Sequence, residues 1–328
     1  MRASPVIRTN VAHVERAHNP FTWSKRTRQN FRLGMLFISP WLIGFLVLQL
    51  YPMLASLVYS FNQFSFHQPL HWVGLKNYTE LFGDKLFWTS LLNIGYMVVL
   101  GVPLILAFSF FCAVVLNLKV PGQSIYRVIY YIPAIVPTVA SVLLWAWVLN
   151  PQWGLLNGAL EIVGIDGPNW FRDPNWSKPA LLLLALWGTG NTMIIYLSGL
   201  QDVPVHLLEA AELDGAGWWQ KMRHVTIPMV SPITVYNLII GMIGMFQYFT
   251  QAYVYSRIAG ANLNYTGASP VGQPLNSTLF YSVYLYQNGF QFLKMGYASA
   301  MAWILFLVIL ACTILMLRVS ERYTYYSG

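Results

Sequence analysis

The chain has 328 residues, of which 56% are hydrophobic and only 9% are charged, and its mean hydropathy is +0.51. Soluble globular domains carry about 25% charged residues, so this composition excludes that class and indicates an integral membrane protein. The net charge of +8 could suggest a nucleic-acid partner, but the basic residues are spread over the connections instead of forming one dense patch. We therefore expect no nucleic-acid binding.

The first 33 residues form a basic segment that precedes the apolar part of the chain. They hold seven Lys and Arg residues against one acid, Glu15, and no apolar run long enough for a signal peptide. Basic segments beside membrane spans stay on the cytoplasmic side. We therefore expect residues 1–33 to be a cytoplasmic tail and residues 321–328 to be a second one.

Six apolar stretches are long enough to cross a bilayer, which takes about 20 mostly apolar residues in a helix. They cover residues 34–61, 90–116, 125–149, 179–200, 229–255 and 295–317. Apart from Arg127 at the start of the third, they lack Asp, Glu, Lys and Arg, so their outer surfaces suit membrane lipid. With cytoplasmic termini, 13 of the 19 Lys and Arg residues lie inside, which agrees with the positive-inside bias. The predicted fold at 34–320 is an all-α polytopic membrane domain.

The longest charged interruption between two apolar runs covers residues 202–228. Each of its charges would cost about 2.5–3.5 kcal/mol at a bilayer centre, so the segment lies outside the membrane. Asp202 is suited to cap a first helix, and Gly215 ends that helix because glycine readily adopts the positive φ of a tight turn. A second short helix is expected to end before Pro228. The prediction is a cytoplasmic helix-Gly-helix elbow.

This spacing resembles the EAA loop of permeases from ATP-binding-cassette (ABC) importers. The resemblance rests on Glu209-Ala210-Ala211, on Gly215 and on Ile227-Pro228. Residues 37–45 and the entry to the third span are similar to the carbohydrate-uptake branch of that family, which includes maltose and glycerol-phosphate permeases. The resemblance implies an ATPase-docking surface made of Glu209, Ala210, Ala211, Asp214 and Gly215.

The resemblance also implies the rest of the assembly. It implies a second homologous permease subunit, two ATP-binding subunits that carry ATP and Mg, and an extracytoplasmic solute-binding protein, all at the cell inner membrane. No Gly-x-x-x-x-Gly-Lys-Ser/Thr phosphate loop occurs in this chain, so it does not supply that cradle for ATP. We therefore expect a transport subunit that is not an enzyme and holds no cofactor.

Two polar connections carry no site in our interpretation. His67 and His71 are four residues apart, but the proline between them disrupts the helical spacing of a metal-binding pair. We therefore expect no metal site. The connection at 256–294 is rich in Gly, Pro and Asn, which predicts a loop rather than a further span.

The spans carry many neutral polar and aromatic side chains. A neutral sugar offers hydroxyls to amides and an apolar ring face to aromatic groups, so such side chains at mid-depth suit it. The alternative is that each one only joins helices, a contact worth about 0.6–2 kcal/mol. As a group they predict a pathway for a sugar or oligosaccharide, lined by Ser141, Trp145, Trp187, Asn191, Gln247, Tyr248 and Gln251.

Two other functions compete with an ABC importer permease for a sugar. A secondary carrier coupled to an ion gradient would work alone, but such carriers keep charged relays inside their spans. A membrane-embedded enzyme or scaffold would need a charged catalytic constellation, and the sequence shows none. Within the importer family, another polar solute such as a glycerol phosphodiester is an alternative if a loop or the partner subunit meets its charge.

The basic tail generates a topological prediction. A Pro20→Cys variant should react with a membrane-impermeant maleimide only after the membrane is permeabilised, because the tail is cytoplasmic. The parent chain is the control, since its two cysteines, Cys112 and Cys312, fall in apolar spans. Labelling in intact cells, read from the mass of the modified protein, would contradict the topology.

Overall fold

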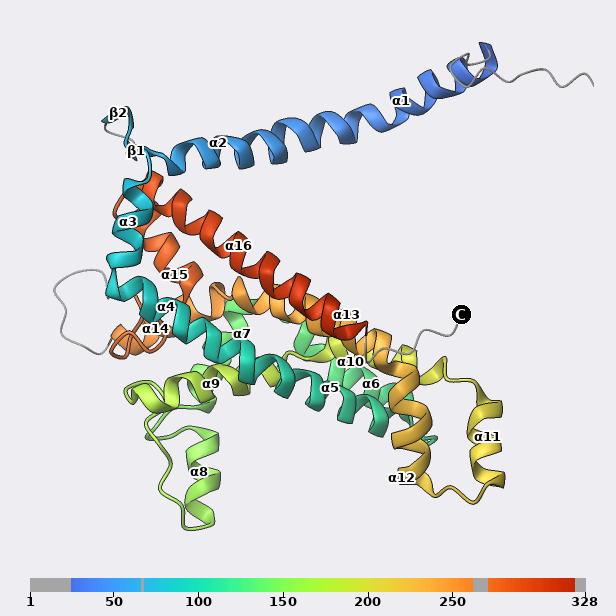
Figure 1. Ribbon diagram of the computed structural model, residues 1–328. Helices are drawn as coiled ribbons and strands as arrows, with labels where there is room; N and C mark the ends of the chain where they lie inside the picture. The colour runs from blue at the N-terminus through green and yellow to red at the C-terminus, as the bar shows by residue number, and fades with distance from the viewer. Residues whose placement is uncertain (1–24, 66–67, 262–270, 322–328) are drawn as a thin grey trace, which may run out of the picture. The chain divides into compact units, whose positions relative to one another are not determined.

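The structure is a computed structural model that describes residues 25–65, 68–261 and 271–321 (Figure 1). Within these ranges the chain is mostly helical, and its only sheet is a short two-stranded hairpin. The chain divides into two units, residues 1–55 and 56–328. This architecture agrees with the predicted all-α class.

The first unit contains α1 (Lys25–Phe45), the π-helical turn η1 (Leu46–Leu50) and the start of α2 (Tyr51–Ser60). These elements form one helix of 36 residues. It begins inside the predicted tail because its first turns contain Arg, Lys and Gln, which are good helix formers. The rest of that tail, residues 1–24, and residues 322–328 lie outside the described ranges.

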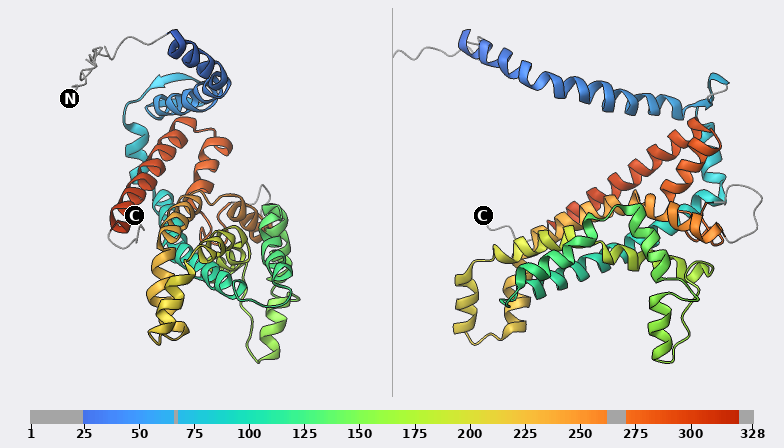
Figure 2. Two further views of the ribbon diagram at one scale, coloured as in Figure 1. Left: turned by 90° about the vertical axis from the view of Figure 1, so that its right-hand side faces the viewer. Right: turned by 180° about the vertical axis from the view of Figure 1, so that it is seen from behind.

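The second unit opens with an antiparallel hairpin in which Asn62 lies opposite Trp72 and Gln63 opposite His71. Helices and π-helical turns follow (Figures 1 and 2). The bounds are β1 Asn62–Ser65, β2 Gln68–Trp72, α3 Lys76–Gly83, α4 Lys85–Tyr96, η2 Met97–Gly101, α5 Val102–Leu116, α6 Gln123–Ile135, α7 Thr138–Val148, α8 Leu155–Ile162, α9 Pro174–Trp187, α10 Gly190–Gln201, α11 Val205–Leu213, α12 Trp218–Lys221, η3 Met222–Thr226, α13 Ile227–Phe246, α14 Thr250–Ala261, α15 Tyr281–Tyr286, η4 Gln287–Gln291 and α16 Met295–Ser320.

Two of the six predicted spans are bent pairs of helices. In the described chain four continuous helices are long and apolar enough to cross a membrane, and six spans result if each bent pair counts as one. The third span bends by 102° between α6 and α7, and the fourth by 49° between α9 and α10. The sharper bend follows from Pro137, which holds Val136 in an extended conformation with ψ 131°.

Three π-helical turns end two residues before a proline: η1 before Pro52, η2 before Pro103 and η3 before Pro228. A proline inside a helix removes one N–H donor, and its ring crowds the carbonyl four residues earlier. A π-helical turn is wider than an α-helical turn and therefore accommodates the ring. Each helix continues through its proline.

The core of the second unit forms where α10 packs against α5, α6 and α13, and where α16 packs against α3, α13 and α15. The connection at 256–294, predicted as a loop, contributes to this core through α14, α15 and η4. Phe280 and Tyr281 within it are fully buried, and the Tyr281 hydroxyl donates to the carbonyl of Met301 at 2.8 Å. The described residues of this connection form no further span, as predicted, but they are not all loop, because the Gly, Pro and Asn residues flank short apolar segments that the core buries.

Asn93 on α4 fastens this connection to the core, and it generates a stability prediction. Its side-chain amide donates to the carbonyls of Asn276 and Leu279 at 2.7 and 3.1 Å. Asn93→Leu keeps the side-chain volume similar but leaves two carbonyls without that donor. The free energy of unfolding should therefore fall by about 1–3 kcal/mol. We expect a lower melting temperature in detergent, by about 2–4 °C per kcal/mol lost. The exposed-site control Asn191→Leu should melt like the parent, and equal melting of both variants would contradict the assignment.

Candidate functional site

The turn of the elbow after α11 is closed by a Schellman motif. Gly215 has φ +81°, and its N–H donates to the carbonyl of Glu212 at 3.0 Å. The N–H of Ala216 donates to the carbonyl of Ala211 at 2.9 Å. A glycine in the left-handed conformation closes a helix in this way. The predicted break at Gly215 is confirmed, and since a Cβ there would meet no atom within 4 Å, only the backbone conformation requires glycine.

The second arm of the elbow is continuous with a membrane span. Elements α12, η3 and α13 form one helix of 29 residues (Figure 1). The prediction that this helix ends before Pro228 is therefore wrong, because η3 lets the helix pass the proline. The arm and the span therefore belong to one continuous helix.

A charged contact ties the two arms of the elbow together. The Lys221 ammonium on α12 lies 3.0 Å from the Glu212 carboxylate on α11, and the Lys221 side chain is only 22% exposed. Gln220 also accepts a hydrogen bond from the N–H of Gly217 at 2.8 Å. Asp202 does not cap α11 as predicted, because it terminates α10 and Pro204 occupies the N-cap position.

The predicted docking residues lie on the surface of this elbow. Glu209, Ala210, Asp214 and Gly215 are exposed, and Ala211 is half-buried. Large apolar side chains surround them, and the sequence interpretation did not include these in the site: Leu213, Trp218 and Trp219. Their presence in a charged segment outside the membrane is a signal that could have revealed them. The elbow thus presents acidic and apolar groups together.

A cavity of about 280 Å³ lies within the membrane domain, where α6, α7, α9 and α13 meet. Four of the predicted pathway residues line it together: Ser141, Trp187, Tyr248 and Gln251. Both helix bends border the cavity, since Val136 and Gly188 are also in its lining. The bends therefore bring distant parts of the sequence to one place.

Two buried donors, one in the cavity lining and one on a residue packed against that lining, are without partners in the described part of the chain. The Tyr248 hydroxyl is one, and the residue is 8% exposed. The other is Nε1 of Trp145, whose ring packs edge to face on Trp187 with centroids 6.3 Å apart. An unsatisfied buried donor costs about 1–3 kcal/mol. A hydroxyl or carbonyl oxygen of a solute bound in the cavity would satisfy the Tyr248 hydroxyl.

The remaining predicted pathway residues lie elsewhere. Asn191 on α10 and Gln247 after α13 are exposed, Trp145 on α7 is half-buried, and none of the three is part of the cavity lining. The lining includes Thr138 and Met245, which the sequence interpretation omitted. Thr138 follows the Val136-Pro137 pair, and that pair is a helix-breaking signal readable from sequence.

The lining chemistry favours neutral polar binding. No charged side chain lines the 280 Å³ cavity. Across the residues that the structure describes, no group of three His, Cys, Asp or Glu residues could hold a metal ion, and His67 lies outside those residues. What the cavity offers is hydroxyl, amide and indole donors beside aromatic faces, the combination that suits carbohydrate hydroxyls and ring faces.

Comparison with known families places the elbow and the 280 Å³ cavity in one domain. The family described as "Binding-protein-dependent transport system inner membrane component" matches residues 105–325. This range includes the elbow and all of the cavity lining.

Individual permease proteins are similar to this chain over most of its length. The probable ABC transporter permease protein YesP of Bacillus subtilis is 38% identical, over 93% of this chain and 96% of its own length. The sulfoquinovosyl glycerol transport system permease protein SmoG of Agrobacterium fabrum is 33% identical, over 88% of this chain and 90% of its own length. A solved structure of a bacterial ABC transporter involved in the import of the acidic polysaccharide alginate shares the fold, with a TM-score of 0.74 and 22% sequence identity. The match covers 92% of this chain and 99% of the chain in that structure.

Proposed function

Because the chain belongs to the family of binding-protein-dependent transport system inner membrane components, we propose that it is the permease subunit of an ABC importer for a sugar or oligosaccharide. The observation that carries this proposal is the continuous helix from the elbow into the membrane domain. A partner that moves the elbow would move the span with it. Import driven by an external ATPase needs such a connection.

The proposed partners follow from the family. The elbow residues Glu209 to Gly215 dock one of two ATP-binding subunits, which hold ATP and Mg. A second homologous permease subunit completes the pathway, and an extracytoplasmic solute-binding protein delivers the solute. The elbow is then cytoplasmic, and both termini lie on the same side of the inner membrane.

The proposed solute is a carbohydrate, and the uncharged cavity supports this class. Ser141 and Gln251 hydrogen-bond hydroxyl groups, and the ring of Trp187 packs on an apolar face of the sugar. The Tyr248 hydroxyl donates to a sugar oxygen. The relative described as a permease for sulfoquinovosyl glycerol also points to a glycoside.

The elbow turn provides a matched pair of variants that tests the proposal. Gly215→Val places a β-branched residue at φ +81°, at a cost of about 1–2 kcal/mol or more, in a turn outside the core. Gly217→Ala is the control, because Gly217 has φ −68° and an added Cβ stays 3.8 Å from its nearest neighbour. We expect Gly215→Val to insert normally yet to lose ATP-driven uptake in vesicles that contain the whole importer. Normal uptake by Gly215→Val would show that the elbow is a passive connector.

The buried hydroxyl in the cavity gives a second prediction. Tyr248→Phe removes a group without a partner in the described chain, so the melting temperature should be unchanged or slightly higher. The KM for uptake should rise by about 5- to 150-fold, which corresponds to the loss of one hydrogen bond worth about 1–3 kcal/mol. A variant with lower stability and an unchanged KM would assign the hydroxyl to folding.

A further inference from the structure

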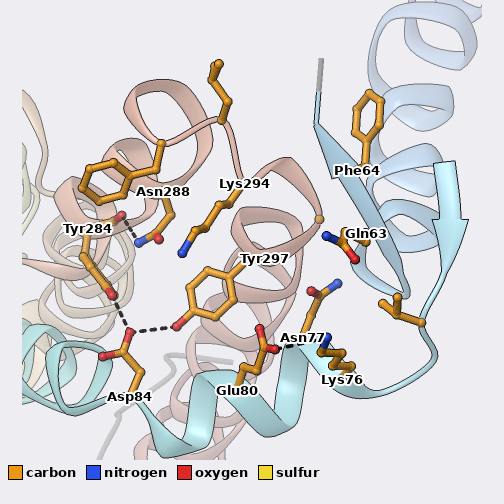
Figure 3. Close-up of a pocket in the computed structure, with 14 residues that line it drawn as sticks. Gln63, Phe64, Lys76, Asn77, Glu80, Asp84, Tyr284, Asn288, Lys294 and Tyr297 are labelled. Atoms are coloured by element: carbon orange, nitrogen blue, oxygen red, sulfur yellow. Dashed lines mark hydrogen bonds and ion pairs between the residues drawn. The ribbon is translucent and has the colours of Figure 1, made fainter. Parts of the chain in front are cut away.

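A second cavity, of about 490 Å³, lies at the end of α16 that is remote from the elbow (Figures 1 and 3). Its walls come from β1 and α3 on one side and from α15, η4 and the start of α16 on the other. Its volume is within the range of about 300–1,000 Å³ that is usual for small-molecule sites. It shares no residue with the cavity of the proposed pathway.

Asp84 holds the floor of this cavity in place. One carboxylate oxygen caps α4 by accepting from the N–H of Leu86 at 2.8 Å. The other accepts from the hydroxyls of Tyr284 and Tyr297, the latter at 2.9 Å. Burial, together with the hydrogen bond to Asp84, raises the pKa of Tyr284 to about 12, so this phenol stays protonated at physiological pH. The Asp84 charge is therefore already matched by three donors.

The neighbouring backbone fixes the same wall. Gly296 approaches β1 so closely that a Cβ would overlap the carbonyl oxygen of Asn62. Leu293 has φ +55°, a left-handed conformation that is uncommon for a residue with a side chain. Together these constraints hold Lys294 and Tyr297 at the cavity.

Polar groups flank the fixed ring of Tyr297 on two sides. Figure 3 shows Tyr297 between Lys294 and Glu80. Within the described chain the Lys294 ammonium has no ion-pair or hydrogen-bond partner, whereas Glu80 lies 3.7 Å from Lys76 on the rim. The side-chain oxygens of Asn77 and Asn288 add acceptors, because the amide nitrogens of both already donate to backbone carbonyls. The cavity thus combines a held aromatic ring with separate donors and acceptors.

We propose that this cavity is a saccharide-binding site for one or two sugar units, distinct from the transmembrane pathway. The Tyr297 ring packs on an apolar sugar face, Lys294 donates to hydroxyl or ring oxygens, and Glu80 accepts from hydroxyls on the opposite side. The inference rests on the proposed function in one respect, since a cytoplasmic elbow places this cavity on the extracytoplasmic side. There it would hold sugar close to the point of delivery.

The test measures sugar binding by the full chain in lipid nanodiscs, using saturation-transfer NMR. The probes are lactose, trehalose, xylobiose and digalacturonate. Glutamate, which is not a sugar and carries both positively and negatively charged groups, is the negative control. We expect binding of at least one saccharide and none of glutamate. Lys294→Gln and Tyr297→Ala should each weaken that binding by about tenfold or more, whereas Thr79→Ala, exposed on α3 outside the cavity, should leave it unchanged.

Lys294→Gln alters an exposed side chain, so its effect does not depend on folding. Absence of saccharide binding to the parent chain, undiminished binding by both cavity variants, or preference for glutamate would each overturn the inference. Uptake by the reconstituted importer separates the two proposals. If the parent importer takes up sugar but the cavity variants bind saccharide as well as the parent chain does, only the saccharide site is disproved. If saccharide binding depends on the cavity but no ATP-driven uptake occurs, only the importer assignment is disproved.

Discussion

One helix, Trp218–Phe246, joins the exposed elbow to the interior of the membrane domain. It stays unbroken because η3 widens the helix just before Pro228 and leaves room for the proline ring. At 1.5 Å per residue, its 29 residues extend about 40 Å. The Glu212–Lys221 contact and the Schellman turn then attach the first arm of the elbow to this helix. We infer that the elbow and the span move together as one lever.

The position of the cavity depends on the same helix. Gly244 and Met245 near its end line the 280 Å³ cavity, and Tyr248 follows directly after it. A rotation of the lever would therefore change the distance of Tyr248 from Ser141 and Trp187, which belong to other helices. In the proposed importer, ATP binding and hydrolysis by the partner subunits would supply the free energy for such a change.

The sequence alone predicts features that depend on local chemistry. The break at Gly215 follows from the conformational freedom of glycine, and the place of each apolar segment follows from composition. The sequence could not reveal that Pro137 bends a span by 102° whereas Pro228 leaves a helix continuous. Packing against neighbouring helices determines whether a wide turn or a break in the helix has the lower free energy. For the same reason, four of the seven candidate pathway residues meet at one cavity while Trp145, Asn191 and Gln247 are not in its lining.

Spin-label distances in the reconstituted importer show whether the elbow and the span move together. Labels are placed at His206 on α11, Ile240 on α13 and Ile129 on α6, all exposed, after Cys112 and Cys312 are replaced. If the elbow and the span move together, the 206–240 distance is the same with and without trapped ATP while the 240–129 distance changes. A changed 206–240 distance with a constant 240–129 distance would show that the elbow flexes without moving the span.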